Sequence, residues 1–485
     1  MDGKDLKQSL SIGTFNEESV FHLYHTARLF YPDWDIKVSV QAITPDICLG
    51  ETAAGLYVTD GTSRLDSPGR DKESIKRLLY RFLASTTGKT IPWGTLIGVR
   101  PTKIASRMLA EGRSEGEIRD FYRETYLTSD GKIDLALDVA KREERILRGE
   151  KENVCGIYID MPFCPTRCFY CSFLSLPSSQ TALMAEYLAA LEKDIIATGR
   201  MIKEFDLHPA YIYFGGGTPT SPDDLPFEKI MGLIDEYFVK DHDISEFTVE
   251  CGRPDTMNET KFASMKVHGC GRISINPQSF CDRTLEAMGR THSGEDIIRA
   301  YRAARSAGFG CINMDVILGL PSETEAEVAM TMEEIIHLDP ENVTIHGLAV
   351  KRGSVIKESG RFHLPDEATV QRMFEVAYQK LYGAGYKPYY LYRQKNISAN
   401  LENIGFSKPG WEGYYNMAMM EETISIIACG ASGMSKQVTV ENGQRKIRRY
   451  SSYKDVRRYI DNLDQIIHDK RQMMEAIAFP TKEFK

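Results

Sequence analysis

The stretch FCPTRCFYC, residues 163–171, places three of the chain's ten cysteines in the pattern CxxxCxxC. It follows directly on the apolar run GIYID, residues 156–160, which predicts a buried strand. In folds that alternate strands and helices, reactive side chains collect on the loops that follow the strands. The three thiols therefore mark the candidate site and indicate the kind of fold that carries it.

Clustered thiols in a chain without a secretory signal indicate metal or redox chemistry, because disulfides are rare in reducing compartments. Structural zinc generally takes four ligands, and no further cysteine or histidine lies close to Cys164, Cys168 and Cys171 in the sequence. Iron–sulfur clusters are held by cysteine thiolates, and three ligands on a cubane leave one iron open. The pattern favours such a cluster; a zinc ion completed by a distant residue and three unligated thiols are the alternatives.

The composition is that of an ordinary globular protein. The 485 residues are 42% hydrophobic and 26% charged, and they are enough for two or three domains. The formal net charge of -8 gives no global positive field that would attract nucleic acid. The N-terminus does not resemble a signal peptide, and no run approaches the roughly 20 apolar residues of a membrane span. These features predict a cytoplasmic protein without a membrane span, and they disfavour a nucleic-acid partner.

The hydrophobic pattern divides the chain into three parts. Residues 1–150 combine short strand-like runs with helical stretches and predict an N-terminal α/β domain. Between residues 151 and 385, six apolar runs alternate with amphipathic stretches, which predicts a parallel sheet covered by helices. Six units predict a partial (β/α)6 barrel instead of a closed eight-stranded one. Residues 386–485 are expected to be mostly helical and to form the substrate side, with residues 390–440 as a lid.

Three glycines follow the second apolar run of the barrel, in YIYFGGGTPT. Gly215, Gly216 and Gly217 allow the backbone to approach a ligand closely, because no side chain stands in the way. Successive glycines also occur in ordinary tight turns, so the motif indicates a ligand site only in combination with its place after a strand.

Polar residues also end the later apolar runs. Glu250 ends the third run, where a carboxylate can pair with a cationic group or with ribose hydroxyls; the alternative is a solvated strand end. Gln278 follows the fourth run. Asp315 lies within the fifth run between apolar neighbours, so its side chain is expected to point inward to a partner, since unpaired burial is costly.

The CxxxCxxC loop after the first strand of a β/α barrel resembles the radical S-adenosylmethionine (SAM) superfamily. The resemblance implies that Cys164, Cys168 and Cys171 hold a [4Fe–4S] cluster whose open iron binds the methionine part of SAM. It further implies that the reduced cluster splits SAM into methionine and a 5′-deoxyadenosyl radical, which takes a hydrogen atom from the substrate.

Within that superfamily, residues from about 155 to 350 resemble the oxygen-independent coproporphyrinogen III oxidase-like family. The motifs that carry this resemblance are YIYFGGGTP, INPQSF, AMGRTHSGEDIIRAY and NMDVILGLP. The segments GYKPYYLYRQKN and IIACGASGMSK extend it into the C-terminal part. LIGVRPTKI together with CPTRCFYCSF is similar to the longer HemZ-type branch, called coproporphyrinogen dehydrogenase. The resemblance therefore covers nearly the whole chain.

Carried over position by position, the resemblance implies a catalytic and SAM-binding role for Tyr158 and places Tyr170 beside the adenine. The glycine segment is implied to contact the amino group of SAM. The implied SAM-binding residues are Tyr158, Tyr170, Gly215, Gly216, Gly217, Thr218, Glu250, Gln278, Arg290 and Asp315. Each also has an ordinary structural interpretation: Tyr158 packs a strand, for example, and Arg290 pairs on a surface helix.

Two positions depart from the oxidases of this family. Their fourth cysteine follows the cluster motif after one residue, whereas Cys171 is followed here by Ser172 and Phe173, as in the haem chaperone branch. Asp160 replaces the histidine that is common at that position, which removes a candidate haem ligand. These departures leave the substrate open.

The resemblance implies oxidative decarboxylation of coproporphyrinogen III propionates to vinyl groups in haem biosynthesis, giving protoporphyrinogen IX, with a low-potential protein as electron donor. Candidate cations for the propionates are Lys351, Arg352, Arg393 and Lys395, although such side chains commonly lie at the surface. A haem-binding or haem-delivery protein without decarboxylase activity is the alternative, with His346 as a candidate ligand near the barrel mouth. An RNA-modifying radical enzyme is a third.

Overall fold

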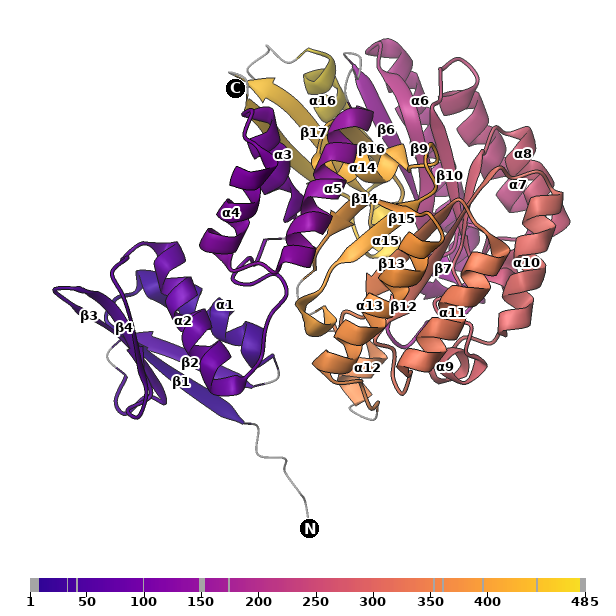
Figure 1. Ribbon diagram of the computed structural model, residues 1–485. Coiled ribbons are helices and arrows are strands. Elements are labelled where there is room, and N and C mark those ends of the chain that lie inside the picture. The colour runs from indigo at the N-terminus through magenta and orange to yellow at the C-terminus, as the bar shows by residue number, and fades with distance from the viewer. Residues whose placement is uncertain are drawn as a thin grey trace. The chain divides into compact units, whose positions relative to one another are not determined.

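The computed structural model describes residues 8–32, 34–40, 42–98, 100–147, 153–172, 175–351, 354–359, 362–394, 397–441 and 444–479. The chain forms two compact units, shown with their elements in Figure 1. Unit 1 comprises Met1–Lys141 and Tyr392–Glu402, and unit 2 comprises Arg142–Leu391 and Asn403–Lys485.

Unit 1 is built on a five-stranded sheet in the order β2-β1-β3-β4-β5. Its elements are β1 (Ser9–Thr14), α1 (Glu18–Phe30), β2 (Asp35–Val40), β3 (Ile47–Thr52), β4 (Gly55–Thr59), β5 (Arg64–Ser67), α2 (Lys72–Thr87), α3 (Thr102–Ala110) and α4 (Glu115–Tyr126), followed by α5 (Asp130–Leu147). The Asp71 side chain caps α2, and Ser114 with Glu117 forms a capping box at α4, so both helix starts are fixed locally. The expected N-terminal α/β fold is confirmed.

A segment from far along the chain completes unit 1. Glu402 is fully buried, and its carboxylate accepts a hydrogen bond from Trp93 Nε1 at 2.7 Å and pairs with Lys132. Arg393 is also buried and donates to the carbonyls of Leu96 and Asn400. The described residues of this segment, 392–394 and 397–402, therefore contribute buried side chains to this unit.

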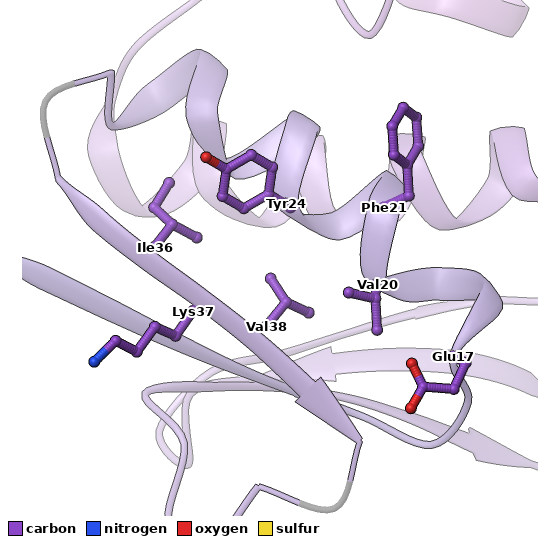
Figure 2. A pocket seen from close by; sticks show the side chains of 7 residues that line it. All are labelled: Glu17, Val20, Phe21, Tyr24, Ile36, Lys37 and Val38. Atoms are coloured by element: carbon purple, nitrogen blue, oxygen red, sulfur yellow. The ribbon is translucent and has the colours of Figure 1, made fainter.

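An open hollow of about 590 Å³ lies between α1 and β2 of unit 1 (Figure 2). Its lining is mostly apolar, with Glu17 and Lys37 at its edges. None of the predicted site residues lines it, and the edge strand β2 forms one of its walls.

Unit 2 contains the predicted barrel. Six parallel strands lie side by side in chain order: β6 (Val154–Met161), β9 (His208–Gly216), β10 (Glu246–Gly252), β11 (Arg272–Ile275), β12 (Cys311–Leu318) and β13 (Asn342–Gly347). The helices between them are α6 (Thr181–Glu204), α7 (Asp224–Ile234), α8 (Glu259–Val267), α9 (Asp282–Ala287), α10 (Gly294–Ser306) and α11 (Glu325–Leu338). They pack along the outer face of the curved sheet (Figure 1). The predicted partial (β/α)6 barrel is confirmed.

The C-terminal region is less helical than the sequence pattern predicted. After α12 (Val355–Ser359) and α13 (Glu367–Gly383), it adds β14 (Lys387–Tyr392), β15 (Asn403–Ser407), β16 (Ser425–Cys429), β17 (Met434–Glu441) and β18 (Gln444–Ser451) to the sheet, with α14 (Tyr414–Glu421), α15 (Val456–Asp461) and α16 (Leu463–Ala478). Strand β15 pairs antiparallel with β13, and β16 pairs parallel with β6. Both strands are buried at every position. The prediction that residues 390–440 form a lid is therefore wrong, because β15 and β16 are part of the sheet.

Among the described residues, no helix has the length and apolar character needed to cross a membrane.

Candidate active site

The cysteine loop leaves the end of β6 and is held by segments that follow other barrel strands. The Phe169 amide donates to the Met288 carbonyl at 3.0 Å, and the Ile356 amide donates to the Phe169 carbonyl at 3.2 Å. The Thr218 hydroxyl donates to Cys164 Sγ at 3.4 Å. Cys164, Cys168 and Cys171 are all partly exposed, as thiols that receive a ligand from outside must be.

The glycine run at the end of β9 lies directly against this loop. A Cβ on Gly217 would come within 2.7 Å of the Phe163 carbonyl oxygen and 3.0 Å of Cys164 Sγ. Gly216 has φ of +109°, and a Cβ there would meet Asp160 Oδ1 at 2.5 Å. Only glycine satisfies both conditions, so the backbone here forms a close cradle beside the thiols.

Tyrosines and acids from neighbouring strands line the inner side of the barrel at this end. Tyr158 donates to Asp160 Oδ1 at 3.2 Å, and Tyr213 donates to Glu250. The Tyr213 ring stacks between Tyr158, at 6.2 Å between centroids, and Tyr415, at 4.7 Å. The result is a continuous aromatic stack with two carboxyl groups at its phenol oxygens.

Burial changes the acidity of these carboxyl groups. It raises the pKa of Asp160 to about 8 and the pKa of Glu250 to about 7, and their mutual repulsion adds to the shift of Asp160. Asp160 Oδ2 is buried and has no hydrogen-bond partner within the described ranges. Carboxyl groups of this kind are stabilised in their charged form by a cationic ligand.

Tyr170 and Arg290 form a second part of the site. Arg290 is buried and donates to the Tyr170 phenol oxygen at 3.0 Å and to the carbonyls of Asn276 and Gly252 at 2.8 and 3.3 Å. It also donates to His292 at 3.2 Å, and burial together with Arg290 lowers the pKa of His292 to about 4. Arg290 therefore does not lie on a surface helix but inside the barrel end, beside the cysteine loop.

Gln278, which follows the end of β11, lies beside Asp315 on β12. The Gln278 amide donates to the Asp315 carbonyl at 2.9 Å, with Gln278 in the left-handed region at φ of 66°. The Asp315 carboxylate accepts from Asn313 at 2.7 Å and lies 3.8 Å from His346 Nε2. Gln278 Oε1 is buried without a hydrogen-bond partner in the described part of the chain, which leaves an acceptor for a ligand.

Two of the four cations that were predicted to bind substrate carboxylates lie within the described residues. Lys351 is half-buried and within electrostatic range of Cys171, and burial lowers the pKa of its ammonium group. Arg393 is committed to carbonyls within unit 1, so its predicted role at the substrate is wrong. Arg352 and Lys395 lie outside the described residues.

Two tyrosines of the stack were not anticipated. Tyr213 lies two residues before Gly215 on the same strand, so the period of two in β-strands places both on one face. That signal was available in the sequence. Tyr415 lies on α14, more than 200 residues further along the chain, and no local pattern connects it with the site.

The residues fit an iron–sulfur cluster and SAM. Three thiols share one loop, the glycine cradle leaves space beside them, and buried acceptors of Asp160 and Gln278 remain open. Within the described ranges, no group of three or more His, Cys, Asp or Glu converges on a single metal ion. A cubane cluster does not require such convergence, because each thiolate binds a different iron.

The fold and this site define a radical SAM protein. Residues 158–335 match the radical SAM superfamily, which implies a [4Fe–4S] cluster and SAM as cofactors. The chain is 38% identical, over 94% of its length and 95% of the relative, to the oxygen-independent coproporphyrinogen-III oxidase-like protein HemZ of Bacillus subtilis. It therefore belongs to the oxygen-independent coproporphyrinogen-III oxidase-like family.

One further relative is similar in sequence, and one solved structure is similar in fold. The heme chaperone HemW of Bacillus subtilis is 32% identical over 54% of this chain and 65% of its own. The solved structure of the coproporphyrinogen III oxidase HemN from Escherichia coli matches 67% of this chain and 72% of the HemN chain, with a TM-score of 0.52 at 20% identity. The last comparison shows the shared fold.

Proposed function

We propose that the protein is a radical SAM enzyme that oxidatively decarboxylates two propionate side chains of coproporphyrinogen III without oxygen, giving the vinyl groups of protoporphyrinogen IX. The observation that carries this proposal is the likeness to the oxidase-like relative along nearly the whole chain, with the cysteines, glycines and acids gathered in one unit. A low-potential protein is the proposed electron donor, and the proposed location is the cytoplasm.

The bound cofactors supply a radical that takes a hydrogen atom from a substrate carbon, while the protein supplies position and excludes water. In this proposal the three thiols hold the cluster and the cradle from Gly215 to Gly217 leaves room for the methionine part of SAM. Glu250 and Asp315 bind its polar groups, and Arg290 fixes Tyr170 beside the adenine. The stack of Tyr158, Tyr213 and Tyr415 keeps water away from the buried carboxyl groups.

A tetrapyrrole with propionate side chains needs cationic groups at the rim of an apolar site. Lys351 is the best-placed candidate, because it is half-buried after β13 and lies close to Cys171. Its lowered pKa reflects the desolvation that an incoming carboxylate would offset. We therefore assign Lys351 to a substrate propionate.

The direct test is an oxygen-free incubation of reconstituted, reduced protein with SAM and coproporphyrinogen III, followed by mass spectrometry of the tetrapyrroles. Two successive losses of carbon dioxide, each together with two hydrogen atoms, are expected because each propionate becomes a vinyl group, and Cys168→Ala should abolish them. Cys281→Ala is the matched control, since Cys281 is partly exposed in the same unit but lies outside the cysteine loop. Cleavage of SAM with an unchanged tetrapyrrole mass would overturn the substrate assignment.

A second candidate is a haem-delivery protein that keeps the cluster but lacks decarboxylase activity. Phe173, which stands where the oxidases of the family have their fourth cysteine, and the likeness to the heme chaperone relative favour it. His346 would be its candidate haem ligand, because the imidazole is partly exposed at the end of β13. Titration with haem, followed by absorbance, separates the two candidates: stoichiometric binding that is lost in His346→Ala, without any tetrapyrrole decarboxylation, would replace the first proposal by the second.

A further inference from the structure

Arg253 connects the end of strand β10 to the middle of the cysteine loop. Its side chain is 4% exposed, although a guanidinium is seldom buried without a specific partner. Nη1 donates to Thr166 Oγ1 at 2.6 Å and to the Thr166 carbonyl at 3.3 Å. Thr166 lies between Cys164 and Cys168, so Arg253 holds the backbone of the loop that carries the thiols.

The orientation of Arg253 is itself fixed by neighbouring groups. Asp255 accepts from Nε at 3.1 Å and from Nη2 at 2.8 Å, which is the bidentate geometry that orients a guanidinium most strongly. Nη2 also donates to Thr291 Oγ1 at 3.4 Å. The Thr166 hydroxyl in turn donates to the Gly289 carbonyl at 3.3 Å, so the loop is held from two directions.

Two buried positive charges lie beside the loop. Arg253 and Arg290 are both buried here, and Asp255 offsets only one of the two positive charges. A cluster bound by three thiolates is anionic, and accepting one electron adds a further negative charge. A buried cation therefore favours the reduced state, because charges interact strongly where water is excluded.

We propose that Arg253 is a positioning residue with two effects: it holds the cysteine loop in the shape that accepts the cluster, and its buried charge raises the reduction potential of that cluster. The inference rests on the cofactor site and not on the identity of the substrate. Arg253 contacts the loop from outside, so it acts through Thr166 and through its charge.

Two measurements test the two effects separately. Redox titration of the reconstituted protein, with dithionite as reductant and EPR detection, gives the midpoint potential of the cluster. Mass-spectrometric timing of iodoacetamide alkylation in the cluster-free protein reports how well the loop protects Cys164, Cys168 and Cys171. Neither measurement involves a tetrapyrrole, so failure of the proposed function would leave both readouts intact.

For Arg253→Met we expect reduction of the cluster to become about tenfold less favourable, a shift of about 59 mV to more negative potential for a one-electron couple. The three thiols should be alkylated several-fold faster. Arg253→Lys keeps the charge but not the fork of hydrogen bonds, so it should leave the potential near that of the unmutated protein while the thiols react faster. Arg299→Met is the control, because Arg299 is exposed on α10.

Far-UV circular dichroism checks that each variant is folded. If Arg253→Met does not fold, Thr166→Val removes the hydroxyl partner and retains the charge, and it should speed alkylation without moving the potential. The proposal is overturned if folded Arg253→Met has the potential and the alkylation rates of the unmutated protein. It is also overturned if the thiols of Thr166→Val are alkylated as slowly as those of the unmutated protein.

Discussion

The Asp160 carboxyl group is buried, and its Oδ2 atom has no hydrogen-bond partner among the described residues. Its pKa is raised to about 8 by burial, whereas an aspartate in an unfolded chain titrates near 3.9. Between these two values the folded protein holds a proton that the unfolded chain has released. The contribution of Asp160 to the free energy of unfolding therefore falls as the pH rises from about 4 to about 8, and it stays constant above that range.

Asp160→Asn should remove this pH dependence. In the cluster-free protein, the stability of the unmutated chain relative to the variant is expected to fall by up to about 1.4 kcal/mol for each pH unit within the window. Thermal unfolding followed between pH 5 and pH 8 measures the effect as a steeper decline of Tm in the unmutated protein. Parallel curves for the two proteins would show that Asp160 is not protonated in the folded state.

The backbone at Gly217 can lie close to the cysteine loop because glycine has no side chain. Gly217→Ala forces a Cβ against the Phe163 and Met161 carbonyl oxygens and Cys164 Sγ, so the loop or the cradle must shift. We expect a loss of stability of about 1–3 kcal/mol and a substoichiometric iron content after reconstitution. Gly271→Ala is the control, since a Cβ there meets nothing within 4 Å; equal iron content in both variants would contradict the close-cradle account.

At the scale of elements, α16 is fastened to α6 by a buried ion pair. Lys470 pairs with Asp194, and the same carboxylate accepts from Tyr459 at 2.9 Å and from the Gly430 amide at 3.0 Å. This network joins the last helix to the turn that follows β16, next to the strand that begins the barrel. The terminal helix is therefore part of the structure that supports the site.

Asp194→Ala should destabilise unit 2 by about 3–5 kcal/mol, because it leaves Lys470 charged and buried without its partner. The same two helices also carry an exposed pair, Arg471 with Glu204, so Glu204→Ala is a matched control that should change Tm little. Urea unfolding of both variants makes the comparison. Similar midpoints for the two would show that the buried pair does not fix the helix.

The elements of the barrel could largely be predicted from the sequence, because each buried parallel strand is a short apolar run between helical stretches. Strands β15 and β16 could not be placed in the same way. Their partners are distant in the sequence, as in the pairs Asn342 with Ser407 and Cys155 with Ser425, and nothing in the local pattern encodes such pairing. The helical interpretation of this region therefore failed.

The residues of the candidate site also divide into those that could be predicted from the sequence and those that could not. Cysteines, glycines and acids at strand ends were found from their spacing and their place after apolar runs, and the structure gathers them in unit 2. Tyr415 and Arg253 were missed, since an isolated tyrosine on a helix or an arginine after a strand carries no signal until the fold brings it to the loop.

At the scale of the whole molecule, the chain leaves the barrel after β14 and contributes residues 392–402 to unit 1 before it returns. Glu402 is the buried centre of this contribution, with Trp93 and Lys132 as its partners. Such a crossing ties the integrity of unit 1 to a residue that lies 309 residues from Trp93 and 270 residues from Lys132 in the sequence.

Glu402→Ala should destabilise unit 1 by about 3–5 kcal/mol, because Lys132 would lose a buried counter-charge and Trp93 Nε1 its acceptor. Denaturant unfolding followed by tryptophan fluorescence should show an earlier transition. Glu115→Ala, which removes an exposed partner of Lys141 in the same unit, is the control and should leave the transition in place. An unchanged transition in Glu402→Ala would mean that residues 392–402 do not stabilise unit 1.

Three thiols that hold a four-iron cluster leave one iron without a protein ligand, and the proposed chemistry depends on such an open iron. The most direct measurement is the Mössbauer spectrum of protein reconstituted with 57Fe, recorded without oxygen before and after addition of SAM. One of four iron sites should change its signal when SAM binds, and Cys171→Ser should lose the intact cluster. A spectrum of four irons that SAM leaves unchanged, or the absence of a four-iron cluster in the folded protein, would contradict the account.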